Sequence, residues 1–421
     1  MERSIFLNLA SKGSTRVENS RPQAGSDVLV SVSPYVPSSS YAGHRLYGRH
    51  LDALAQHFDT WVLSPEATSI GSGGPRWQIA PLSQGSFWRG CLSVARRIVS
   101  RVAMVVTGLA IRPSMLVGSG SRRARSLIRS AGVVELQWTS ALTLIPTVRR
   151  LNSSALVVGY FHEVANDPYR RIVSASSTQA IALRRVYKSE RAAERRLLNA
   201  LDLAVVLSDK DGHLLEHLGF QGEVFVVHPP IEVAGVVSGL HPGEVVTFAA
   251  HFGRPENANG ARWLIDEVWP FVLSSMPNSV LKIVGANPPR WLLRRESPNV
   301  LVTGWVPDLN KYLSESRVVA VPLHGGAGVK LKILEAMAHH VPVVSTVVGA
   351  DGIVQVVGED SFVAITDDPR EFASSIIRMV GDNTQWLNIS SRAHSAILEH
   401  YDFKGTVASL AERYRVGRRG T

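Results

Sequence analysis

A short glycine-rich segment followed by charged side chains is the part of the sequence best suited to chemistry. The segment His324 to Gly328 holds three glycines in five residues. It follows the apolar run Val318 to Leu323, typical of a strand buried on both faces, and precedes a helical repeat of apolar residues from Val329 to Ala338. Strand, glycine loop and helix in this order present backbone N–H groups and a positive helix end to an anion. The segment therefore favours an anion site, with an ordinary strand-to-helix turn as the alternative.

Three charged side chains follow this loop. Lys330 and Lys332 fall in the first turn of the predicted helix, and Glu335 lies one to two turns in, within reach of a sugar hydroxyl. The alternative is that both lysines are simply solvated. Pro342 ends the helix, and a further strand begins at Val343.

The residues around the loop resemble the donor-site signature of the family 4 (group 1) glycosyltransferases. The resemblance is carried by the run G-G-A-G-V-K-L-K-I-L-E-A-M-A and the following P-V-V-S-T-x-x-G-A-D-G. Three upstream stretches match the family in the same order: Val246 to Pro270, Leu281 to Pro288 and Val302 to Leu309. The resemblance is colinear from Val245 to Ile365 and is limited to scattered motifs in the first half of the chain.

This resemblance implies an α/β protein of the GT-B fold, with two Rossmann-like domains facing each other across a deep cleft. A length of 421 residues also suits two domains. The expected divisions are a disordered tail over 1–26, an N-terminal acceptor-side domain over 27–232, a linker over 233–244, a C-terminal nucleotide-sugar-binding domain over 245–398, and a C-terminal helix over 399–421 that crosses back to the N-terminal domain.

The resemblance also assigns the donor-binding residues. It places Gly43 in a loop beside the donor phosphates, ahead of a helix predicted from about Arg45, and Arg254 against the pyrophosphate. The lysine that many members carry shortly after this arginine is absent, and Lys330 is expected to substitute for it. The full set of expected donor-binding residues is Gly43, Gly253, Arg254, Gly325, Gly326, Ala327, Gly328, Val329, Lys330 and Glu335.

A histidine and a glutamate follow another predicted strand, Leu156 to Tyr160. A lone histidine at a strand end is often structural, but the resemblance places His162 near the donor sugar and the acceptor, with Glu163 on the acceptor side. The catalytic candidates are therefore His162, Lys330 and Glu335. Ala327 stands where many members carry a glutamate that touches the transferred sugar, so the identity of the sugar is left open.

Transfer of a glycosyl group from a nucleotide diphosphate depends mainly on stabilising the leaving group. Backbone amides, a helix N-terminus and cations can do this without a metal. We expect no metal and no cofactor beyond the nucleotide-diphosphate sugar itself, on the reasoning that no Asp-x-Asp stands at a strand end to hold a divalent ion. The resemblance implies that the configuration of the sugar is retained.

Positive charge is concentrated in one segment. No Asp or Glu occurs between Ala67 and Val134, and ten arginines there account for the whole formal excess of +10. This segment suits an anionic membrane surface, with a merely basic solvated face as the alternative; nucleic acid is not favoured because no recognised binding motif is present. The candidates for the acceptor or membrane side are Glu163, Arg96, Arg97, Arg101, Arg122 and Arg123.

The remaining features are consistent with a cytoplasmic protein, peripheral on the inner face of the cell membrane. Cys91 is the single cysteine, which excludes internal disulfides and fits a reducing compartment. We find no signal peptide, and no apolar run reaches the ~20 residues needed to span a bilayer. Two local predictions are that residues 64–86, rich in Gly, Pro and Ser, form an irregular excursion, and that residues 258–274 form one helix.

Three functions are compatible with these residues. The first is a glycosyltransferase that uses a nucleotide sugar to extend a lipid-linked or polysaccharide acceptor. The second is a sugar-nucleotide epimerase on the same scaffold, which needs no acceptor surface and is therefore less consistent with the arginine-rich segment. The third is a non-enzymatic GT-B-like protein that binds a nucleotide.

Overall fold

The computed structural model describes residues 27–37, 42–67, 69–74, 76–82, 121–164, 195–231, 233 and 243–417. The expected tail, the arginines from Arg89 to Arg112, most of the expected linker and residues 418–421 lie outside this part of the chain.

The N-terminal domain is built on a mainly parallel sheet. Among the described residues this sheet has eight strands in the order β3-β4-β2-β1-β5-β6-β7-β8, and only the β3–β4 pair is antiparallel. The strands are β1 (Val28–Val32), β2 (Asp59–Ser64), β3 (Gly71–Ser72), β4 (Gln78–Pro81), β5 (Val133–Gln137), β6 (Leu156–Phe161), β7 (Leu203–Val206) and β8 (Glu223–Val226). The helical elements are α1 (Ala42–Leu54), α5 (Arg122–Ser130), η1 (Thr139–Leu144), α6 (Ile145–Leu151) and α9 (Asp209–His217). Every residue of β5, β6 and β7 is buried, as expected for strands covered on both faces.

The C-terminal domain is built on a second sheet, whose six strands follow the order β11-β10-β9-β12-β13-β14 with all neighbours parallel. The strands are β9 (Val245–Ala249), β10 (Val280–Val284), β11 (Val300–Gly304), β12 (Val318–Val321), β13 (Val343–Ser345) and β14 (Ala364–Ile365). The helical elements are α10 (Pro255–Trp263), η2 (Leu264–Val268), α11 (Trp269–Ser275), α12 (Arg290–Leu293), α13 (Asn310–Ser314), α14 (Leu331–Ala338), α15 (Val347–Ala350), α16 (Val354–Val357), η3 (Glu359–Ser361), α17 (Pro369–Gly381), α18 (Asn383–His400) and α19 (Phe403–Gly417).

Each sheet contains a point at which the order of the strands reverses. In the first sheet β2 and β5 lie on opposite sides of β1, and in the second β10 and β12 lie on opposite sides of β9. Open parallel sheets bind ligands outside the carboxyl ends of their strands at such a switch point. The loops after β1, β5, β9 and β12 are therefore the positions where this fold places binding residues.

One local prediction is wrong because a buried tryptophan organises the segment. Residues 64–86 contain β3 and β4 rather than only an irregular excursion. The Trp77 indole N–H donates to Asp52 Oδ1 at 3.0 Å, and its ring packs with Tyr47 and Leu51 of α1. These contacts hold the segment against the edge of the sheet.

The predicted single helix over 258–274 is also revised. It begins earlier, at Pro255, and its middle turn, η2, is a π-helix. Pro270 lies just beyond this turn and has no N–H to donate to the preceding turn. The widened turn accommodates that missing hydrogen bond.

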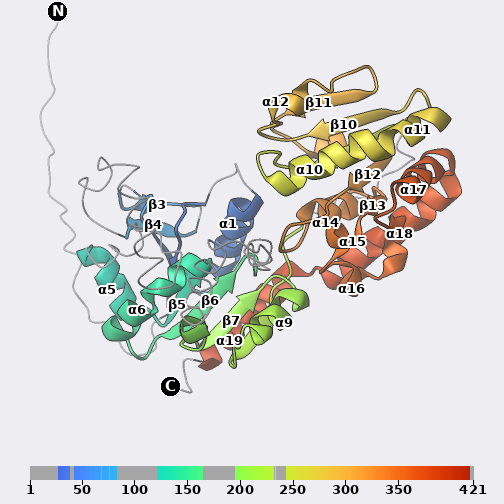
Figure 1. Cartoon of the computed structure of the whole chain (residues 1–421). Coiled ribbons are helices and arrows are strands. Elements are labelled where there is room, and N and C mark those ends of the chain that lie inside the picture. Colours follow the sequence, from blue (N-terminus) through green and yellow to red (C-terminus); the bar gives the residue numbers. More distant parts are fainter. Residues whose placement is uncertain are drawn as a thin grey trace, which may run out of the picture.

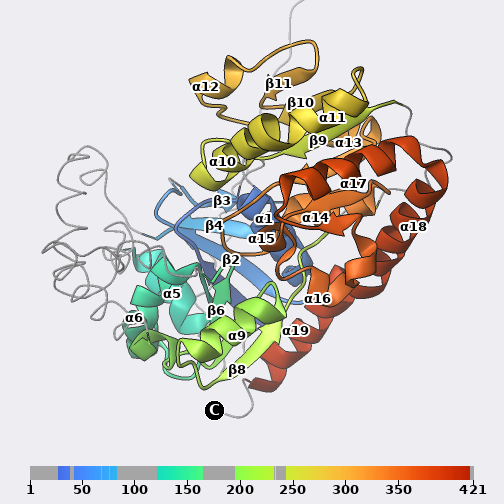
Figure 2. The ribbon, with the colours of Figure 1, turned by 45° about the vertical axis from the view of Figure 1, so that its right-hand side comes forward.

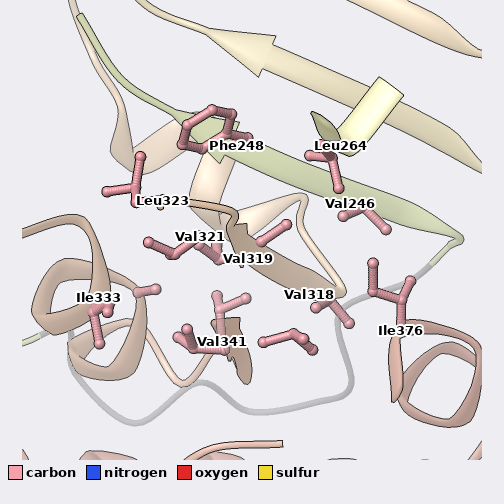
Figure 3. Packing of buried hydrophobic residues seen from close by; sticks show 14 of the residues in the cluster. Val246, Phe248, Leu264, Val318, Val319, Val321, Leu323, Ile333, Val341 and Ile376 are labelled. Atoms are coloured by element: carbon pink, nitrogen blue, oxygen red, sulfur yellow. The ribbon is translucent and has the colours of Figure 1, made fainter. Parts of the chain in front are cut away.

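The C-terminal apolar core sets the orientation of α14. Figure 3 shows Phe248 of β9, Val319 and Val321 of β12 and Ile333 of α14 around this core, and all four are fully buried. Burial of such a side chain stabilises the fold by about 1.5–3 kcal/mol. Because Ile333 and its neighbours Leu334 and Met337 take the core-facing side of α14, residues three and four apart on its other side face away from the core.

The last helix, α19, packs on the N-terminal domain although it follows the C-terminal domain in the chain. Figures 1 and 2 show it, in red, beside β7 and β8. Four of its side chains enter an apolar cluster of the N-terminal domain: Val407, Leu410, Ala411 and Tyr414. The Tyr414 hydroxyl also donates to Glu135 Oε1 at 2.6 Å, so α19 contributes to the polar centre of the first sheet.

We expect Tyr414→Phe to lower the free energy of unfolding by about 1–3 kcal/mol, because the fully buried Glu135 loses one of its hydrogen-bond donors. Urea unfolding followed by circular dichroism measures this change. Tyr312→Phe, a half-buried position of the C-terminal domain, is the matched control and should change stability by less than about 0.5 kcal/mol. Equal effects of the two substitutions would contradict this interpretation.

Candidate active site between the two domains

The glycine loop after β12 lies against both domains. Val329 and Leu331 pack against the apolar clusters of the C-terminal and the N-terminal domain alike. A Cβ built on Gly328 would lie 3.0 Å from the Cβ of Glu163, at the end of β6. The predicted donor loop and the predicted acceptor-side strand are therefore in direct contact.

Two left-handed glycines shape this loop. Gly326 has φ 110° and Gly328 has φ 69°, values that only glycine adopts readily. The helix that follows begins at Leu331 rather than at Val329, and Lys330 is its N-cap residue. The predicted strand, loop and helix are thus present, with the helix two residues shorter.

Lys330 is bound to its own loop rather than solvated. Its side chain is only 7% exposed, and Nζ donates to the carbonyl oxygens of Gly328 at 2.7 Å and of Gly326 and Ala327 at 3.4 Å. In a trans peptide the N–H group points opposite to the carbonyl. The N–H groups of residues 327–329 therefore point away from the ammonium group, which is the arrangement of an anion-binding nest.

Lys332 is a site residue that sequence reasoning missed. It is partly buried, and its Nζ donates to Asn257 Oδ1 at 3.1 Å. Burial, and then the charges of Lys330 and Arg254, lower the pKa of Lys332 to about 7; burial, followed by the charge of Lys210, lowers the pKa of Lys330 to about 8. The available signal was its position three residues before Glu335, on the same side of the helix.

Arg254 lies in the loop after β9, beside the glycine loop. Its Nε donates to Glu256 Oε1 at 2.6 Å, and its Nη2 lies 3.7 Å from Oε2 of Glu163 in the N-terminal domain. At Gly253 a Cβ would lie only 2.8 Å from the ring of His251, so this close approach favours glycine. Arg254 therefore stands between the two domains with its guanidinium about half exposed.

Glu335 faces the N-terminal domain. Arg45 Nη2 of α1 donates to Glu335 Oε1 at 3.4 Å, and burial raises the pKa of the Glu335 carboxyl. The sequence analysis did not select Arg45. Gly43 lies in the first turn of α1 rather than in a loop, because the helix begins at Ala42.

His162 lies at the end of β6 and is held by two neighbours. Its Nε2 is 2.9 Å from Gln137 Oε1, and its ring stacks on Trp138 at 4.0 Å with an interplanar angle of 20°. Burial, with the neighbouring charges of His50 and His44, lowers the pKa of His162 to about 3. The imidazole is therefore neutral near pH 7.

The reason given for expecting no metal does not hold. Asp209 and Asp211 form an Asp-x-Asp pair directly after β7. Asp211 is buried and accepts hydrogen bonds from Ser208 Oγ at 2.8 Å and from Val164 N at 3.2 Å, so it serves the local structure of α9. Within the described residues no group of three or more His, Cys, Asp or Glu is placed to hold a metal ion. Whether a metal is needed stays a prediction.

A further ion pair joins the domains near the glycine loop. Lys210 of α9 forms a hydrogen-bonded ion pair with Asp351, in the turn after α15. A Cβ on Gly352 would lie 3.6 Å from the Lys210 side chain, so this glycine also allows the domains to approach. Charged contacts thus surround the loop on its N-terminal-domain side.

The described arginines of the basic segment lie elsewhere. Arg122 and Arg123 begin α5, and the Arg123 guanidinium lies 4.7 Å from the Trp61 ring centroid. Figures 1 and 2 both place α5 at the end of the N-terminal domain away from the C-terminal domain. Arg96, Arg97 and Arg101 lie outside the described residues. Of the helices that the structure describes, none has the length and apolar character to cross a bilayer.

Sequence comparison finds similarity over part of the chain. Residues 243–382 match the family described as "Glycosyl transferases group 1". A Klebsiella pneumoniae protein described as an uncharacterized 44.6 kDa protein in the cps region is 29% identical over 174 residues, which cover 39% of this chain and 44% of that protein. This match thus spans less than half of the relative's length.

Structural comparison finds similarity over nearly the whole chain. Sucrose-phosphate synthase from Thermosynechococcus elongatus superposes with a TM-score of 0.66 at 14% identity, over 94% of this chain and 100% of that one. TarM gives 0.65 at 10% identity, over 92% and 98%. Anabaena HepE in complex with UDP-glucose gives 0.62 at 13% identity, over 92% and 98%. These similarities confirm the predicted GT-B fold, with two Rossmann-like domains.

The pKa of Lys332 predicts a pH-dependent affinity for anions. Lys332 is charged below pH 7 and loses its charge as the pH rises through about 7, so its contribution to anion binding should be lost over this range. Lys332→Arg keeps the charge at every pH. Calorimetric titration with pyrophosphate at pH 6 and pH 8.5 should show that the wild type loses affinity relative to this variant; the paired comparison cancels the ionisation of pyrophosphate itself. An unchanged ratio between the two proteins would refute the assignment.

Proposed function

We propose that this protein is a retaining glycosyltransferase that moves a sugar from a nucleotide-diphosphate sugar to a lipid-linked or polysaccharide acceptor, without a metal or another cofactor. One observation carries the proposal: the glycine loop and its cations meet the end of β6, with His162 and Glu163, across the boundary of the two domains. An anion site and a sugar-facing strand end are thus adjacent, as transfer from a nucleotide sugar requires.

The leaving diphosphate is the group that most needs stabilising. In this proposal the N–H groups of residues 327–329 and the N-terminus of α14 bind it, while Arg254 and Lys332 supply positive charge. Lys330 holds the loop carbonyls on the opposite side and adds its own charge. Glu335 binds a sugar hydroxyl of the nucleotide after releasing Arg45.

The acceptor is proposed to approach from the N-terminal domain, beside His162 and Glu163. The cps-region location of the Klebsiella pneumoniae relative supports a role in polysaccharide biosynthesis. A structure of S. aureus TarM holds UDP and α-GlcNAc-glycerol, which shows a nucleotide and a glycosylated product bound to a protein of similar fold. Attachment of the basic segment to the inner face of the cell membrane stays part of the proposal.

Two other functions make different predictions for the same assay. A sugar-nucleotide epimerase would convert its substrate without steady release of nucleoside diphosphate. A nucleotide-binding scaffold would bind without turnover. Continuous release of nucleoside diphosphate that depends on an acceptor therefore separates the first function from the other two.

We predict that Lys330→Ala and Glu335→Ala each lower turnover strongly. Loss of a single group that stabilises a leaving anion typically lowers kcat by about 10²–10³-fold. Release of nucleoside diphosphate measures the effect, and far-ultraviolet circular dichroism checks that both variants fold.

Lys282→Ala and Glu315→Ala serve as matched controls, since these residues form an ion pair in the same domain at 2.6 Å. Both controls should keep nearly full activity. Wild-type turnover in the Lys330 and Glu335 variants would refute the assignment of the site.

A further inference from the structure

A buried carboxylate in the first sheet accepts hydrogen bonds from three side chains. Glu135, in the middle of β5, is fully buried. It lies 3.0 Å from His50 Nε2, 3.0 Å from Gln137 Nε2 and 2.6 Å from the Tyr414 hydroxyl. An ionised carboxylate only accepts hydrogen bonds, so each of these three groups must turn a donor towards it.

This requirement fixes the side-chain amide of Gln137. Its Nε2 donates to Glu135 Oε2 at 3.0 Å and to Ser31 Oγ at 3.2 Å, which uses both of its hydrogens. A flipped amide would bring its oxygen against the carboxylate, and two acceptors would then face each other in a buried site. The carbonyl oxygen of Gln137 therefore has to face away from Glu135.

That oxygen faces His162. Gln137 Oε1 lies 2.9 Å from His162 Nε2, and because an amide oxygen only accepts, Nε2 must carry the hydrogen. The imidazole is neutral, as its lowered pKa indicates, so Nδ1 has no hydrogen and presents a lone pair. Within the described residues this buried nitrogen has no hydrogen-bond partner.

The ring is also held in its plane. Trp138, the residue after β5, has the left-handed backbone angles φ 61° and ψ 153°, which are costly for a side chain of this size. Its indole stacks on His162 at 4.0 Å. Strained residues persist where the surrounding structure requires them, and they are common at functional sites.

We infer that Glu135 and Gln137 are positioning residues that hold His162 as the tautomer with hydrogen on Nε2, leaving Nδ1 to accept a hydrogen bond from a hydroxyl of the bound sugar substrate. The assignment of the tautomer stands on the network alone, whereas the role of the hydroxyl rests on the proposed glycosyltransferase function. The network extends to Tyr414, so α19 reaches His162 through Glu135 and Gln137.

Nitrogen-15 NMR of the full-length protein with labelled histidine tests this inference, because couplings to the ring protons show which nitrogen carries the hydrogen. The signals of His162 are identified by their loss in His162→Gln. Wild-type protein at pH 7 should show a single tautomer, protonated at Nε2. Glu135→Gln lets the Gln137 amide turn over, and Gln137→Met removes the acceptor at similar volume; both should shift His162 towards the Nδ1-protonated form.

Ser31→Ala is the matched control, because it removes the other acceptor of Gln137 Nε2 and leaves the carboxylate in place. It should leave the His162 tautomer unchanged. A wild-type His162 protonated at Nδ1, or identical His162 signals in wild type and Gln137→Met, would overturn the inference.

Kinetics then separate the two proposals. If the glycosyltransferase function holds, Gln137→Met should lower kcat/KM by roughly tenfold, the equivalent of one hydrogen bond, while Ser31→Ala should not. No nucleoside diphosphate release from a protein with the predicted tautomer would refute the proposed function and the hydroxyl contact, and would leave the tautomer assignment standing. Full activity with the opposite tautomer would refute the inference alone.

Discussion

Three cations lie together at the amino end of α14, and this concentration of partly desolvated positive charge is the constraint on which the site depends. Lys330 and Lys332 lower each other's tendency to stay protonated through burial and like charge, and Arg254 adds to the effect on Lys332. Such an arrangement is costly in the absence of an anion. The glycine loop answers the same need, since its N–H groups are turned away from Lys330 and a helix N-terminus lies behind them.

The fold accounts for this concentration of charge. Arg254 follows β9 and the glycine loop follows β12, and these adjacent parallel strands flank the switch point of the second sheet. The hydrogen bond from Lys332 to Asn257 connects the two loops. Opposite them, the end of β6 brings His162 and Glu163 from the switch side of the first sheet. Arg45, Lys210 and α19 then join the domains around this point.

Local sequence was sufficient for the loop itself. Glycines at 326 and 328, between a continuous apolar strand and an amphipathic helix, have a conformational reason that is visible without a structure. The paired Rossmann-like fold followed from the resemblance and is confirmed by the structural comparison. Neither of these depends on contacts between distant residues.

Long-range contacts explain what the sequence did not reveal. Lys332 was interpreted as solvated because its partners, Asn257 and the ring of Phe248, belong to the preceding β9–α10 unit. Glu135 was a strand residue without a role until Tyr414, in the last helix, was placed beside it. Trp77 converted an irregular stretch into the edge of a sheet through contacts with α1. Each of these depends on packing between elements far apart in the chain, which periodicity does not encode.

The most direct test of the anion site is a thermal-unfolding titration of the full-length protein with a panel of nucleotide-diphosphate sugars, each paired with the nucleoside of the same base. A ligand that binds only the folded protein stabilises it according to its concentration relative to its dissociation constant, by about 2.7 kcal/mol at a hundredfold excess. The account predicts that at least one nucleotide sugar raises the unfolding temperature in this way and that its nucleoside does not. If no member of the panel shifts the unfolding temperature, or the nucleoside shifts it equally, the loop before Lys330 does not bind a diphosphate.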